Sequence, residues 1–141
     1  MERVPSVRSK LRPFVERELT ASAAARRTDR AGAWTALERA HILSQPSAWL
    51  HTRVHWRMLT LAMRDVDLRE AMGQVIRLAV AGIGSAAGRF PAGNTGRARV
   101  ALVANGPIPE DIAATFAQLD IVVAGTTVAG GRADGRSGRL G

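Results

Sequence analysis

The chain of 141 residues contains no cysteine and no tyrosine, and it has only three phenylalanines and one lysine. The absence of cysteine excludes disulfides, thiolate metal sites and a cysteine nucleophile. Few aromatic rings are available to stack on single-stranded bases, so a nucleic-acid partner is not expected although the net charge is +8. No apolar run is long enough to cross a bilayer and no signal peptide is visible, so we expect a cytoplasmic protein without a membrane partner.

The spacing of the apolar residues predicts an all-α chain of four to five helices. Thr28 or Asp29 is expected to cap the second helix, and Asp67 with Glu70 has the spacing of a capping box that opens the fourth. The third helix carries two apolar stripes, so we expect it to be the central and most buried one. The expected helices span residues 13–25, 29–44, 46–64, 67–88 and 107–119.

A weak internal repeat suggests how these helices pack. The pattern Asp-x3-Ala-x3-apolar-x-Arg begins at Asp29 and again at Asp67. It predicts two stacked helical hairpins of the kind that tetratricopeptide repeats form. A Gly-rich loop and a disordered Gly/Arg-rich tail are expected to follow. The predicted organisation is an N-terminal arm at 1–12, a helical domain at 13–119 and a flexible tail at 120–141.

The three histidines and one glutamate form the most chemically distinctive cluster in the sequence. Glu38 and His41 share one face of the second predicted helix, and His51 and His55 share a face of the third. At a rise of about 1.5 Å per residue, His41 and His51 lie about 6 and 7.5 Å from the turn between the two helices. They should therefore face each other in an antiparallel hairpin. The same reckoning places Glu16 of the first helix near the level of Glu38.

Imidazole and carboxylate ligands suit a divalent transition metal such as Zn, Ni, Cu, Mn or Fe. The sequence thus predicts a metal site made by Glu38, His41, His51, His55 and Glu16. A di-iron bundle is disfavoured, because it needs two Glu-x-x-His pairs and only one is present. The alternative is a structural network in which the histidines bond to Glu38 and to main-chain groups.

The Gly-rich loop at residues 88–97 has the components of a small-anion site, namely free main-chain N–H groups, arginines and a hydroxyl. It does not match a nucleotide-binding Walker loop, so no nucleotide is expected. A compact structural turn is the alternative. Arg77 of the fourth predicted helix is expected near the level of His55 and joins this group. The anion-binding candidates are Arg77, Arg89, Asn94, Thr95 and Arg97.

Several segments together resemble an uncharacterised bacterial family, the domain of unknown function 3703. They run from Trp34 to Pro46, from His51 to His55, from Gly73 to Leu78, from Gly88 to Ala98 and over residues 107–109. The resemblance covers roughly Phe14 to Phe116. It implies a small helical protein and places both the histidine cluster and the glycine loop in family motifs, but it implies no activity.

These observations leave three functions open. The first is a helical protein that binds a divalent metal through the Glu/His cluster. The second is a tetratricopeptide-like interaction module with a protein partner and a structural histidine network. The third is a small enzyme that acts on an anionic substrate, with histidine as general base and the arginine loop as the anion site. The sequence does not decide whether the protein is an enzyme.

Overall fold

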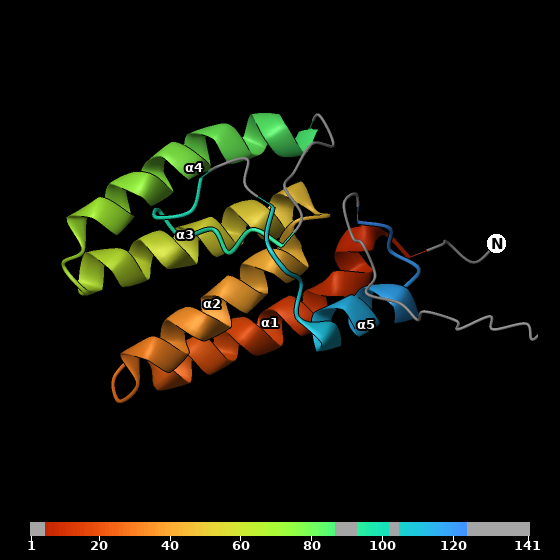
Figure 1. Ribbon diagram of the computed structural model, residues 1–141, viewed down its shortest axis with the longest axis horizontal. Coiled ribbons are helices and arrows are strands. Elements are labelled where there is room, and N and C mark those ends of the chain that lie inside the picture. The colour runs from red at the N-terminus through yellow and green to blue at the C-terminus, as the bar shows by residue number, and fades with distance from the viewer. Residues whose placement is uncertain (1–4, 87–92, 102–104, 124–141) are drawn as a thin grey trace, which may run out of the picture.

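The computed structural model describes residues 5–86, 93–101 and 105–123, and it describes side chains only up to residue 80 in the first of these ranges. The helices are α1 (Val7–Ala25), α2 (Arg30–Ser44), α3 (Ala48–Arg64), α4 (Leu68–Ala86) and α5 (Glu110–Gln118). No strand occurs within the described ranges. Figure 1 shows α1 paired with α2 and α3 paired with α4, with the two hairpins side by side and α5 beside the first. The all-α prediction of stacked hairpins is therefore confirmed.

Local signals set most of the helix boundaries. The Asp29 carboxylate accepts a hydrogen bond from the Gly32 amide at the start of α2. The Asp67 carboxylate accepts one from the Glu70 amide at the start of α4. Each bond satisfies an amide that has no partner inside the helix, which is why short acidic side chains begin helices. Asp29 and Asp67 therefore cap these helices as predicted. The reciprocal bond of the capping box is not made, because the Asp67 amide donates to the Ala62 carbonyl and the Glu70 carboxylate accepts from the Ala98 amide.

The start of α1 differs from the prediction. The helix begins at Val7 and continues through Pro13, the residue that was expected to open it. The Ser6 hydroxyl caps this earlier start by accepting a hydrogen bond from the Ser9 amide. Pro13 removes one main-chain hydrogen bond from the helix. Burial of Leu11 and Val15, which are both fully inaccessible to solvent, offsets that loss.

The hydrophobic core lies between α1, α2, α3 and α5. Leu11, Leu37, Val54 and Phe116 are among the buried side chains that form it. No large apolar side chain of α4 within residues 68–80 is buried. Only one of the two apolar stripes of α3 is buried, because Trp56 and Met63 are 60% and 67% exposed, which corrects the prediction for that helix.

Candidate metal site

Three imidazoles meet where α2 and α3 face each other. The Nε2 atom of His41 lies 2.8 Å from Nε2 of His51 and 3.1 Å from Nε2 of His55. The Nε2 atoms of His51 and His55 are 3.1 Å apart. All three side chains are buried. The positions of the histidines along the two helices therefore predicted correctly that the three rings meet, although His51 and His55 lie ten and fourteen residues after His41.

The opposite ring nitrogens of His41 and His55 face oxygen acceptors. Nδ1 of His41 lies 2.7 Å from the main-chain oxygen of Asn94. Nδ1 of His55 lies 2.7 Å from Oε1 of Gln74. The Gln74 amide nitrogen donates to Glu70 Oε1 and to the Gly96 carbonyl, so its oxygen must be the atom that faces His55. Both Nδ1 atoms consequently carry the proton of the neutral ring.

With the protons on Nδ1, the Nε2 atoms of His41 and His55 each carry a lone pair. These two Nε2 atoms face each other without a proton between them. A proton on His51 Nε2 can satisfy one of these two acceptors well, but not both. Burial lowers the pKa of His51 to about 3 and that of His55 to about 4, with repulsion from other positive groups adding to the effect. Burial also lowers the pKa of His41 well below its ordinary value. The cluster is therefore neutral near pH 7 and rich in unshared electron pairs.

The segment Gly93–Ala101 is folded against this cluster. The Asn94 side chain holds the turn, because its oxygen accepts from the Gly96 amide and its nitrogen donates to the Ala101 carbonyl. Gly96 has a φ of +79°, and a Cβ built there would lie 2.6 Å from the His41 ring. A residue other than glycine at this position would therefore both strain the main chain and displace His41.

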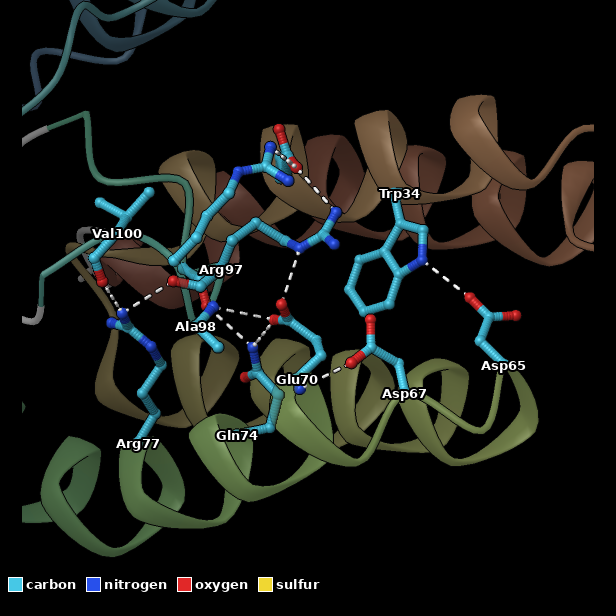
Figure 2. A network of polar contacts seen from close by, with 12 residues as sticks. Trp34, Asp65, Asp67, Glu70, Gln74, Arg77, Arg97, Ala98 and Val100 are labelled. Carbon is cyan, nitrogen blue, oxygen red and sulfur yellow. Dashed lines mark hydrogen bonds and ion pairs between the residues drawn. The ribbon is translucent and has the colours of Figure 1, made fainter.

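Helix α4 holds the same segment from the other side, as Figure 2 shows. Glu70 accepts from the Ala98 amide at 3.0 Å and pairs with Arg97 at 3.1 Å. The guanidinium of Arg77 donates to the carbonyls of Arg97 and Val100. The inward face of α4 is thus polar, and it joins the loop to the helix α3 that carries His51 and His55.

The two predicted carboxylate ligands lie elsewhere. Glu38 accepts from Arg97 at 3.2 Å, and Glu16 pairs with Arg53. Among the described residues, the group of ligand atoms that lie within 4.8 Å of one another contains His41, His51 and His55 alone. Strong arginine partners hold both carboxylates away from the imidazoles, which the spacing along the helices did not reveal.

The predicted anion-binding residues are largely engaged within the protein. Arg77 donates to main-chain carbonyls, and Arg97 pairs with carboxylates while its guanidinium stacks 3.9 Å from the centre of the Trp34 ring. Asn94 builds the turn. The Thr95 hydroxyl is buried and has no hydrogen-bond partner within the described part of the chain. Arg89 lies outside the described residues.

The sequence pattern did not identify Gln74 and Glu70 as contributors to the site. Their spacing carried a signal, because Glu70, Gln74 and Arg77 recur every three or four residues and so share one face of a helix. That polar face is directed inward, with exposures of 5%, 0% and 6%, contrary to the usual arrangement. The partner of this face is a loop 20 to 28 residues away in the chain, which no local pattern identifies.

The family model "Protein of unknown function (DUF3703)" matches residues 9–116. The chain belongs to this family. No curated protein matches it, and no solved structure does. All three histidines of this DUF3703 protein, together with Gln74, Asn94 and Gly96, lie within the matched residues. None of the helices in the described ranges is long and apolar enough to span a membrane.

Proposed function

We propose that this protein binds a divalent transition metal through Nε2 of His41, His51 and His55. The observation that carries the proposal is the convergence of three buried Nε2 atoms within 2.8–3.1 Å, two of them fixed as lone-pair donors by acceptors at Nδ1. Lone pairs directed at one another repel in a buried site, and a cation removes that repulsion. Metal-bound histidines commonly donate the other ring N–H to a carbonyl in this way.

The nitrogen spacing supports an ion with open coordination positions. At a metal–nitrogen distance of about 2.1 Å, neighbouring ligands lie about 3.0 Å apart around an octahedral ion and about 3.4 Å apart around a tetrahedral one. The separations of 2.8–3.1 Å are close to the octahedral value. Three protein ligands then leave one face of the ion for water or another small ligand. Imidazole ligands suit Zn, Ni, Cu and Fe in particular.

Charge favours an anion as the additional ligand. Three neutral imidazoles leave the full charge of a divalent ion in place, and Arg77 is close enough to lower the pKa values of the histidines. Neither Glu38 nor Glu16 belongs to the ligand group. A hydroxide or another small anion on the open face would offset this positive charge.

Isothermal titration of untagged protein with Co²⁺, Ni²⁺ and Zn²⁺ tests the proposal. We expect one ion per chain, and for Co²⁺ visible absorption bands that report the ligand field. His51→Ala should weaken binding at least tenfold. Glu38→Gln is the matched control and should bind with nearly wild-type affinity, because Glu38 pairs with Arg97.

Failure of all three ions to bind the wild type would overturn the proposal. Equal affinities of the wild type and His51→Ala would overturn it as well. A loss of affinity in Glu38→Gln as large as that in His51→Ala would restore the carboxylate to the ligand set and contradict the three-histidine site.

A further inference from the structure

Between residues 68 and 80, helix α4 has its apolar face on the outside. Its buried positions are polar, as described above, while its exposed positions between residues 68 and 80 are apolar except for Arg69. The large exposed side chains, which we call the α4 stripe, are Leu68, Met72, Val75, Ile76 and Val80, each between 45% and 78% exposed. A surface helix normally shows the opposite distribution. Burial against the part of the chain that the structure describes therefore does not explain these residues.

The stripe continues onto α3. Trp49, Trp56 and Met63 recur every seven residues, so they lie along one side of that helix, and they are 48%, 60% and 67% exposed. A hollow lined by Trp49, Arg53 and Trp56 of α3 and by Leu78 of α4 connects the two helices. The apolar surface thus extends across the second hairpin.

We propose that a second copy of this chain covers the α4 stripe together with Trp49, Trp56 and Met63 of α3, with the two α4 helices antiparallel across a two-fold axis. This inference does not depend on the metal site, because it concerns the opposite face of α4. A large side chain presents roughly 100 Å² of apolar surface when fully exposed, so the eight residues expose roughly 450 Å² per chain. Because interface cores are about 65% apolar, two copies would bury roughly 1,400 Å² in total, the size of a standard specific interface.

The distribution of charge on this surface favours a second copy of the chain over other partners. An acidic protein or an anionic membrane surface would require cationic groups distributed along the stripe, but Arg69 is the only exposed charged residue of α4 up to Val80. On α3, Arg53 borders the hollow beside Trp49 but pairs with Glu16, and the exposed Arg8 of α1 stacks on the Trp49 ring at one end of the surface. Arg57 and Arg64 lie toward α1, where they line a separate hollow with Leu19 and Arg26. A nearly uncharged apolar stripe is complementary to itself, and two-fold dimers are the commonest oligomers.

Arg69 also determines the relative direction of the two α4 helices in the proposed dimer. Parallel α4 helices would place the two Arg69 side chains beside each other. In an antiparallel pair centred near Val75, each Arg69 lies about 9 Å from the axis along the helix and about 18 Å from its counterpart. That separation exceeds the screening length of about 8 Å at physiological ionic strength, so the repulsion becomes small.

Molar mass in solution tests the dimer. Light scattering coupled to size exclusion should give twice the 15.0 kDa of one chain. Ile76→Glu should yield a monomer with an unchanged helical circular-dichroism spectrum, because that side chain is directed away from the core. Val122→Glu is the matched control: it introduces the same charge at a position that is 93% exposed and lies outside the second hairpin, and it should remain dimeric.

The absence of native cysteine provides a second test, which reports the geometry. Val75→Cys, near the axis, should form a disulfide between chains on mild oxidation, whereas Leu68→Cys should not, because its counterpart would be roughly 20 Å away along the helix. A monomeric wild type at every concentration up to millimolar would overturn the proposal. Co-sedimentation of that monomer with vesicles of phosphatidylglycerol would instead identify a lipid surface. Cross-linking through Leu68→Cys but not Val75→Cys would contradict the antiparallel arrangement.

Discussion

His41 and His55 are each held at both ring nitrogens, and this determines the chemistry available to them. Acceptors at Nδ1 fix the tautomer, and the mutual approach of the Nε2 atoms concentrates lone pairs in a buried site. Burial keeps the rings neutral, because a charged imidazolium loses its hydration in the interior. Neutral imidazole is the form that binds metals, so the conditions that disfavour protonation also favour the proposed metal binding.

The depressed histidine pKa values predict that acid destabilises the metal-free protein. The ordinary histidine value is 6.5, whereas His51 and His55 have values of about 3 and about 4 when folded. At pH values between the folded and the unfolded pKa, the unfolded chain binds protons that the folded chain does not. The free energy of unfolding should therefore fall as the pH falls. Each histidine contributes up to about 1.4 kcal/mol per pH unit.

Urea unfolding with a chelator present, at several values between pH 7 and pH 5, measures this slope. His51→Gln should flatten it, since one of the titrating groups is then absent. A free energy of unfolding that stays constant or rises toward pH 5 in the wild type would contradict the neutral, buried state of the cluster.

Helix α4 acts as the support of the site although it supplies none of the three imidazoles. Its Gln74 positions His55, and its Glu70 and Arg77 hold the segment that contacts His41. The start of this helix was predictable, because a capping residue acts on amides within one turn. The role of its polar face was not, because that role depends on a loop distant in sequence.

Gln74→Leu should test this support. The substitution keeps the helix and much of the volume, but it leaves the Nδ1–H of His55 without its acceptor and the Gly96 carbonyl without its donor. Loss of such a partner typically reduces metal affinity by 10- to 100-fold. We expect Co²⁺ titration to show that reduction, together with an altered visible spectrum.

Leu78→Ala is a suitable comparison for Gln74→Leu, because it changes a partly exposed side chain on another face of α4 and should leave the affinity nearly unchanged. Equal affinities of Gln74→Leu and the wild type would remove Gln74 from the site.

The proposed metal would connect the two hairpins of the molecule. His41 belongs to the first hairpin, while His51 and His55 belong to the second. An ion that binds only the folded chain stabilises it by about 2.7 kcal/mol at 100 times its dissociation constant. For a protein of this size the midpoint of thermal unfolding should rise by roughly 5–10 °C.

Differential scanning calorimetry with and without Zn²⁺ measures that shift, and hydrogen exchange locates it. We expect slower exchange of the amides of α2 and α3 and of the Gly93–Ala101 segment. His51→Ala should show no comparable shift. Protection of α3 alone would indicate a site that does not include His41, contrary to the arrangement proposed here.

The sequence was sufficient for the helices, their hairpin pairing and the meeting of His41 with His51 and His55. These features follow from helical periodicity, from caps such as Asp29 and Asp67, and from the constant rise per residue, all of which act over short stretches of chain. It did not predict that Glu38 and Glu16 pair with arginines, or that Gly96 contacts His41. Those outcomes depend on which distant groups share a buried space and satisfy one another's charges and hydrogen bonds, and only the tertiary structure brings them together.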